Sequence, residues 1–118
     1  MSIGTELNFS IRQGEDEIFE TDAGAFVYDS DGVALDLTAM TEMVFAARKQ
    51  RASTNAIEID LASGQWTLFA DGTFSLDLAA ADTNVETGTY TYQIVATDGS
   101  GDVSTLYYGV LTVVGTIV

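Results

Sequence analysis

The sequence predicts an all-β fold, an immunoglobulin-like antiparallel β-sandwich of about seven or eight strands with one short connecting helix. Three observations support this prediction. Apolar and polar residues alternate along most of the chain, whereas almost nothing recurs at helical spacing. Turn residues interrupt the alternation roughly every 8 to 12 residues. The 118 residues contain no linker and are 47% hydrophobic, so we expect one domain spanning residues 1–118.

Strands are expected throughout the first half of the chain. Leu7, Phe9 and Ile11 alternate with polar neighbours in a strand that ends at Gln13-Gly14. Further extended segments are predicted at 18–28, 33–37 and 43–47, with an Asp/Gly-rich turn over 29–32. A helix over 38–48 is the competing prediction for the last of these segments.

The second half contains the clearest hairpins. Ile57, Ile59 and Leu61 alternate with acidic residues and are followed by a turn at Ser63-Gly64. Asp71-Gly72 is a strong hairpin signal between 65–70 and 73–78, because both central turn positions favour positive φ. Residues 78–85 have helical composition and predict the short connecting helix. The final hairpin pairs 89–97 with 103–114 around a Gly- and Asp-rich tip.

The composition limits the chemistry that the chain can carry. It has no Cys and no His, on which thiolate and imidazole metal sites, serine triads and cysteine nucleophiles depend. We therefore expect no enzymatic activity and no cofactor. A net charge of −14 repels nucleic acid and anionic membranes, so neither is an expected partner. Residues 1–4 have no basic n-region, so we expect synthesis in a cytoplasm. The apolar run 110–118 is too short to span a bilayer.

Two groups of residues are candidates for a protein interface. Arg48, Lys49 and Arg51 are three of only four basic residues and lie within four positions of one another. They could pair with carboxylates of a neighbouring copy, or they could be neutralised within the monomer. Tyr107 and Tyr108 are adjacent on one strand and therefore face opposite ways, which leaves one of them exposed or on a second sheet face.

Acidic loops raise the possibility of a calcium site. Asp29-Ser30-Asp31-Gly32 has the spacing with which a calcium loop begins, but the later ligands of such a loop are missing. A plain turn is the favoured interpretation. Asp98 and Asp102 flank the tip of the last hairpin and are interpreted in the same way. No metal site is predicted.

Several short motifs follow one another in order and together cover nearly the whole chain. They are Phe9-Ser10-Ile11-Arg12-Gln13-Gly14-Glu15-Asp16, then 28–38, the strand 43–49, Asp71-Gly72-Thr73-Phe74-Ser75-Leu76, and Gly88-Thr89-Tyr90-Thr91-Tyr92-Gln93-Ile94. In this order they resemble a family of small bacteriophage β-sandwich domains from tail, baseplate and tail-fibre-adaptor proteins, including the N-terminal domain of siphophage upper baseplate proteins. One difference is that Thr38 is followed by Ala39 where the family often has Thr-Gly.

The resemblance implies a structural, non-enzymatic virion subunit, assembled in the host cytoplasm, and it carries over no binding residue. Its expected partners are other virion proteins and further copies of itself, as a trimer or hexamer. A tail or baseplate adaptor and a capsid decoration (cement) protein are both compatible with a single domain. The alternative is a carbohydrate- or cell-surface-binding β-sandwich module that uses exposed tyrosines and acidic loops, with or without calcium.

Overall fold

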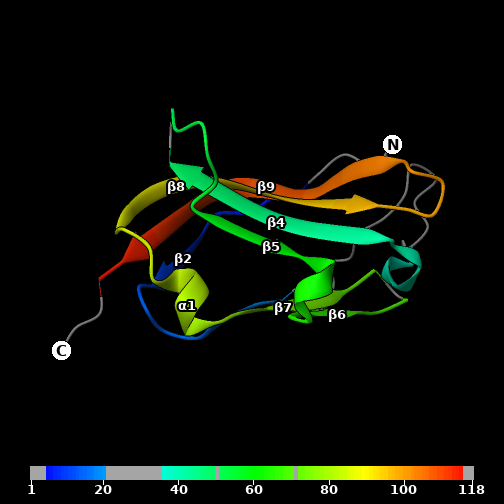
Figure 1. Cartoon of the computed structure of the whole chain (residues 1–118), viewed down its shortest axis with the longest axis horizontal. Coiled ribbons are helices and arrows are strands. Elements are labelled where there is room, and N and C mark those ends of the chain that lie inside the picture. Colours follow the sequence, from blue (N-terminus) through cyan, green and yellow to red (C-terminus); the bar gives the residue numbers. More distant parts are fainter. Residues whose placement is uncertain (1–4, 21–35, 50, 71, 116–118) are drawn as a thin grey trace.

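The computed structural model describes residues 5–20, 36–49, 51–70 and 72–115, and these ranges form two facing β-sheets (Figure 1). The expected turn at 29–32, for which a calcium loop is the less favoured interpretation, lies outside the described residues, as do the extended segment 33–35 and most of 18–28. The elements are β1 (Thr5–Glu6), β2 (Phe9–Arg12), β3 (Glu17–Glu20), η1 (Leu37–Ala39), β4 (Glu42–Lys49), β5 (Ile57–Asp60), η2 (Leu61–Ser63), β6 (Trp66–Leu68), β7 (Phe74–Leu78), α1 (Ala80–Thr83), β8 (Gly88–Thr97) and β9 (Val103–Val114).

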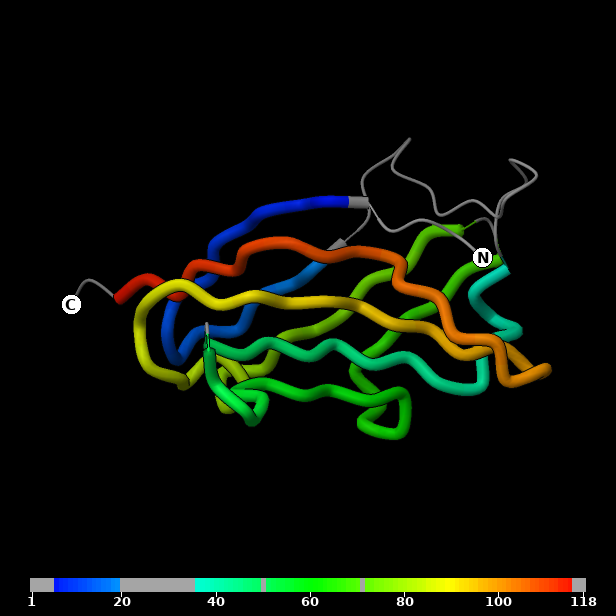
Figure 2. The backbone as a smooth tube through the Cα atoms, turned by 90° about the horizontal axis from the view of Figure 1, so that it is seen from above, coloured from blue at the N-terminus to red at the C-terminus, as the bar shows by residue number. Residues whose placement is uncertain are grey.

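Sheet A contains β1, β9, β8, β4 and β5 in that order, with β2 also on β9. These strands lie side by side in Figure 2, which views the molecule from the side of sheet A. Both β1 and β2 pair with β9 in one continuous parallel register, so they are successive pieces of a single edge strand. The described part of the chain therefore has eight strands when β1 and β2 count as one.

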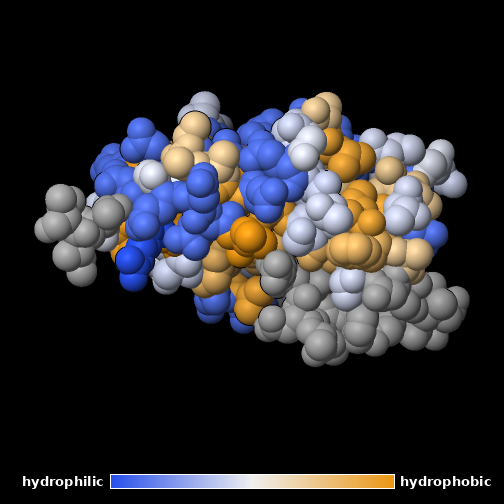
Figure 3. All heavy atoms as spheres, turned by 90° about the horizontal axis from the view of Figure 1, so that it is seen from below, coloured by the Kyte–Doolittle hydropathy of each residue, from blue (hydrophilic) through white to orange (hydrophobic). Residues whose placement is uncertain are grey.

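Sheet B is smaller and purely antiparallel, in the order β3, β7, β6. The expected pairing of β6 with β7 is confirmed, with Trp66 opposite Leu76. Figure 3 shows the molecule from the side of sheet B, where hydrophilic side chains gather at the end nearest α1 and hydrophobic ones lie toward the middle.

The core lies between the sheets and is rich in aromatic rings. Phe45 stacks on Tyr92 with ring centroids 5.5 Å apart, and Phe19 stacks on Phe74 at 5.7 Å. Phe9 joins the two pairs by edge-on contacts with Tyr92 at 5.0 Å and with Phe19 at 5.1 Å. Such offset and edge-on contacts add stability beyond burial of area. The alternating residues of the sequence supply this core because every second side chain of a strand faces the other sheet.

Within the described ranges α1 is the one α-helix, and hydrogen bonds from its first turn and from Thr83 hold it in place. The Asp82 carboxylate accepts a hydrogen bond from the Ala79 backbone N–H, and Asp16 accepts one from the Ala80 N–H. Thr83, which is buried, donates to the carbonyl oxygen of Glu15. These contacts attach the turn before β3 to the connection between β7 and β8. The short helix expected at 78–85 is confirmed.

The prediction of strands and of one short helix is confirmed, and so is a strand at 42–49 over the competing helix. The prediction of a fully antiparallel arrangement is wrong, because β1 and β2 run parallel to β9. Alternation reports which face of a strand is buried but not the direction of its neighbour. No described helix has the length and apolar content that crossing a membrane requires.

Candidate functional site: the outer face of sheet A

The outward side chains of β4, β8 and β9 form the surface that we call the outer face. Its positions alternate with the buried core residues of the same strands. Strand pairing arranges them in rows across the sheet. The rows are Arg48–Thr91–Val110, Ala46–Gln93–Tyr108, Val44–Val95–Thr105 and Glu42–Thr97–Val103, with Thr89, Thr112 and Val114 beyond the first.

The outer face is largely uncharged in a chain of net charge −14. Every outward position of β8 and β9 is Thr, Gln, Val or Tyr. Four of these apolar side chains are clearly exposed, Tyr108 at 43%, Val110 at 39%, Val103 at 57% and Val114 at 40%. The face has one charge at each end of β4, namely Glu42 and Arg48. Exposed apolar side chains grouped in this way mark interaction surfaces more often than scattered single ones do.

The structure separates the two predicted tyrosines. Tyr107 is 3% exposed and packs against Phe19 at 5.7 Å and Phe74 at 5.9 Å between ring centroids, so it belongs to the core. Tyr108 lies on the outer face beside Gln93. A bulge near Ile94 and Val95 shifts the alternation of β9, which is why Leu106 and Tyr107 are both buried. Of the pair, Tyr108 is the one that a partner can reach.

The three neighbouring basic residues are separated in a similar way. Arg48 points to the outer face, where its Nε donates to Asn55 Oδ1 at 3.2 Å, and Asn55 in turn donates to Glu58 at 2.7 Å. Arg51 is exposed just beyond β4, with a positive φ of 69°. Both line a hollow of about 300 Å³ together with Asn55, Thr91 and Gln93, which we call the basic hollow. No carboxylate among the described residues forms an ion pair with either arginine.

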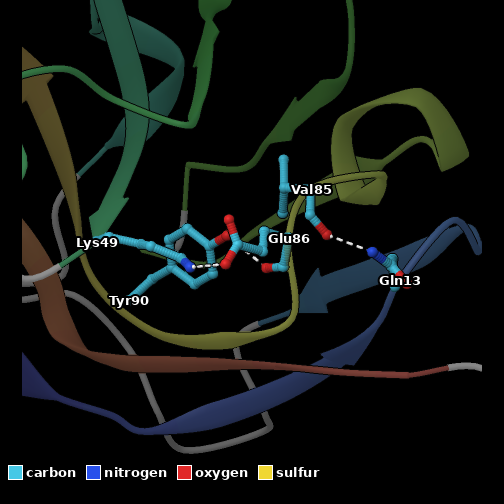
Figure 4. A network of polar contacts seen from close by, with 5 residues as sticks. All are labelled: Gln13, Lys49, Val85, Glu86 and Tyr90. Atoms are coloured by element: carbon cyan, nitrogen blue, oxygen red, sulfur yellow. Dashed lines mark hydrogen bonds and ion pairs between the residues drawn. The ribbon is translucent and has the colours of Figure 1, made fainter.

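Lys49 points to the other side of β4, toward the start of β8 (Figure 4). Its Nζ lies 2.7 Å from Glu86 Oε1 and 5.8 Å from the centroid of the Tyr90 ring. The hydrogen bond to Glu86 raises the pKa of Lys49, and the same contact lowers the pKa of Glu86, so the pair stays charged around neutral pH. Neutralisation within the monomer therefore applies to Lys49.

A second set of contacts fixes the loop that carries Glu86. Tyr90 donates its hydroxyl hydrogen bond to the Glu86 carbonyl, and Gln13 Nε2 donates to the Val85 carbonyl at 2.8 Å (Figure 4). The Tyr90 ring is buried, so its hydroxyl is the one polar atom that must find a partner there. The loop is held from both the β8 side and the edge strand of sheet A.

We expect Tyr90→Phe to lower the free energy of unfolding by about 1–2 kcal/mol, because it leaves the Glu86 carbonyl without its side-chain donor. Urea denaturation measures the change. Tyr108→Phe is the matched control, since Tyr108 is exposed and its loss of a hydroxyl is expected to stay within about 0.5 kcal/mol. Equal effects of the two substitutions would contradict this role of Tyr90.

Sequence reasoning missed the partners of the basic residues. Glu86 and Asn55 are joined to Lys49 and Arg48 by the fold and by no sequence motif. The uncharged outer face did leave a signal, because Thr, Gln and Val occupy alternate positions of the two longest strands in an otherwise acidic chain. Within the described ranges, no three His, Cys, Asp or Glu side chains are grouped so that they could hold a metal ion.

The comparisons with known proteins assign the chain to no family. No protein-family model matches the sequence, and no curated protein matches it significantly.

Proposed function

We propose that this protein is a non-enzymatic structural subunit of a bacteriophage virion, acting through protein–protein contacts made by the outer face of sheet A. One observation carries the proposal: the two longest strands present an uncharged, partly apolar surface in a chain of net charge −14. Its location is the virion, after assembly in the host cytoplasm, and its partners are other virion proteins.

The charge distribution supports a contact role on physical grounds. A net charge of −14 keeps an abundant subunit soluble before assembly. A face without that charge lets partners approach where contact is made. Interface centres are depleted in charged residues and enriched in Tyr and Arg, a composition that Tyr108 and Arg48 fit. A tail or baseplate adaptor and a capsid decoration protein are both compatible with such a contact face.

We also propose that the two sheets have immunoglobulin-like connectivity. The order β9-β8-β4-β5 facing β3-β7-β6 supports it, as does an edge strand formed by the N-terminal β1 and β2. A further support is Tyr90 near the start of β8, whose hydroxyl donates to a backbone carbonyl four residues upstream. This resembles the tyrosine corner of immunoglobulin-like domains.

Val110→Asp tests the proposed contact face. The substitution places a charge beside Thr91 in the outer face, at a position that is already exposed, so the fold is expected to survive. We expect at least a tenfold loss of incorporation into phage particles when the variant complements a deletion of the gene, measured by quantifying the protein in purified particles.

Ile18→Asp is the matched control, because Ile18 is 61% exposed on β3 of sheet B. We expect it to be incorporated normally. Normal incorporation of folded Val110→Asp protein, or absence of the wild-type protein from purified particles, would sink the proposal.

The basic hollow favours a second candidate function, binding of an acidic carbohydrate. Arg48 and Arg51 line the hollow, and Tyr108 lies next to Gln93 on its border. Guanidinium groups pair with carboxylates and sulfates, and aromatic faces pack on sugar rings. Binding to a glycan array that disappears in Arg48→Ala would favour this carbohydrate-binding function. Loss of the same binding on addition of a chelator would show that it depends on calcium.

A further inference from the structure

The basic residues of the molecule are gathered at one end of sheet A. All four, Arg12, Arg48, Lys49 and Arg51, lie at or just beyond this end, where Glu86 pairs with Lys49 and an acidic turn follows β2. At the opposite end, where the β8–β9 hairpin turns, the nearby charged side chains are acidic, Glu42, Asp98 and Asp102 among them. Figure 2 shows the two ends, the hairpin tip on one side and the end of β4 on the other.

The two ends cannot neutralise each other within one molecule. Arg48 lies opposite Thr91, and seven residues of extended strand separate Thr91 from Asp98, a distance of about 23 Å. Charges are largely screened beyond about 8 Å at physiological ionic strength. The polarity is therefore available to a second molecule.

The outward residues of β4 carry this polarity into the contact face. They read Glu42, Val44, Ala46 and Arg48, that is, one negative charge, two small apolar side chains and one positive charge. This pattern is complementary to itself when two copies of β4 run antiparallel across an interface. Glu42 then lies opposite Arg48 of the second copy at both ends, and the apolar residues meet in the middle.

Symmetry selects between the ways in which two identical sheet faces can pack. A two-fold axis along the strands stacks them parallel and places like charges over one another. A two-fold axis across the strands reverses them and places the basic end of each copy over the acidic end of the other. Like charges in contact oppose association, so the charge pattern favours the second arrangement.

The area of the face is adequate for a weak, specific dimer. The three strands of the outer face together with the edge strand, at a spacing of about 4.8 Å and a length of about 30 Å, give about 580 Å² of flat sheet per copy. The edge strand adds two outward charges, Glu6 beside Tyr108 and Arg12 beside Val114. The total of about 1,200 Å² is at the lower end of specific interfaces. The acidic Glu58 and Asp60 lie on β5 and would face each other if the contact extended there, so it ends at β4.

We infer that the occupant of the outer face is a second copy of this chain, bound face to face about a two-fold axis that crosses the strands. This inference rests on the proposed function, and it identifies a second copy of the chain as a partner of the outer face. Of the two expected copy numbers, it is compatible with a hexamer built from two-fold and three-fold contacts and not with a simple trimer.

Charge reversal with heterodimer rescue tests the arrangement. We expect the wild-type protein to dimerise in a concentration series followed by light scattering, and Arg48→Glu and Glu42→Lys each to weaken their own dimer at least tenfold. A 1:1 mixture of the two variants is expected to associate within about threefold of the wild-type Kd.

Thr91→Glu, in the outer face, is expected to weaken the dimer. Thr67→Glu is its matched control, because Thr67 is exposed on β6 of sheet B.

Glu42 also accepts hydrogen bonds from the backbone N–H groups of Met43 and Leu61, so Glu42→Lys could unfold locally. Val44→Lys mixed with Ala46→Glu gives the same rescue test without that risk, because Val44 and Ala46 face each other across the axis. A wild-type monomer at every concentration, or a mixture no tighter than its components, would overturn the inference.

The particle assay separates this result from the proposed function. If the wild type is monomeric and Val110→Asp is still excluded from particles, the second copy is the wrong partner and the structural role stands. If the dimer responds to charge as expected but Val110→Asp enters particles normally, the dimer stands and the proposed role of the face is wrong.

Discussion

Tyr92→Ala is expected to lower the free energy of unfolding by about 3–5 kcal/mol, the largest loss for any single side chain that we predict. Tyr92 is 1% exposed and its ring contacts Phe9 and Phe45 at centroid distances of 5.0 and 5.5 Å. Removing the ring leaves a cavity where both sheets and the edge strand meet. Thermal or urea unfolding followed by tryptophan fluorescence measures the loss, because Trp66 is buried in the same core.

The hydroxyl of Tyr92 makes a separate contribution that Tyr92→Phe isolates. It donates a hydrogen bond to the Leu7 carbonyl, and burial raises the pKa of the phenol, so the proton stays in place near neutral pH. We expect Tyr92→Phe to cost about 1–2 kcal/mol. A loss in Tyr92→Ala no larger than that in Tyr92→Phe would mean that the ring packing contributes nothing measurable.

Gly109→Ala is expected to cost about 2–4 kcal/mol and to detach the edge strand from β9. An added Cβ at Gly109 would lie 2.4 Å from the Leu7 carbonyl oxygen and 2.7 Å from Asn8 Oδ1, and the backbone φ is 153°. The first contact is to backbone, which has no rotamer by which to move away. Hydrogen exchange of the β1 and β2 amides reports the detachment directly.

Gly64→Ala is the control for Gly109→Ala, because it separates steric overlap from backbone strain. Gly64 also has a positive φ, 78°, but an added Cβ there meets no atom within 4 Å. We expect it to cost only about 1 kcal/mol from strain. Equal losses at the two glycines would show that overlap with Leu7 does not matter.

The two sites are coupled, because Tyr92 lies opposite Gly109 in the pairing of β8 with β9 and both meet Leu7. Asn8 adds a third contact, since its Oδ1 accepts a hydrogen bond from the Val110 N–H at 2.8 Å. The edge strand is thus held by backbone pairing and by two side chains at its midpoint. The losses of Tyr92→Phe and Gly109→Ala should therefore not add in the double variant.

The sequence predicted correctly those strands and turns that depend on residues close together in the chain. Alternation along 42–49 identified a strand with Met43 and Phe45 inward, and the composition of 78–85 identified the short helix. Turn residues predicted the final hairpin. These features depend on neighbours in the chain, and those neighbours are visible in the sequence.

Features that depend on distant residues could not be predicted in the same way. The parallel pairing of β2 with β9 joins Phe9 to Leu111, and Lys49 finds Glu86 only after β4 and β8 are in place. The assignment of Tyr107 to the core and Tyr108 to the surface followed from a bulge that shifts the alternation. The sequence correctly predicted that Tyr107 and Tyr108 face opposite ways, but it could not indicate which of the two is buried.

The amino-acid sequence by itself determined an all-β chain with a short helix, an acidic surface, and a set of strands whose alternate residues are apolar, because each of these depends on composition or on spacing between near neighbours. Only the tertiary structure decided the direction of the edge strand, the partner of each basic residue, and the assembly of Arg48, Tyr108 and the uncharged positions into one face. The physical reason is that strand order and register are set by packing and hydrogen bonds between segments far apart in the chain, and a period of two residues is the same whichever strand lies alongside.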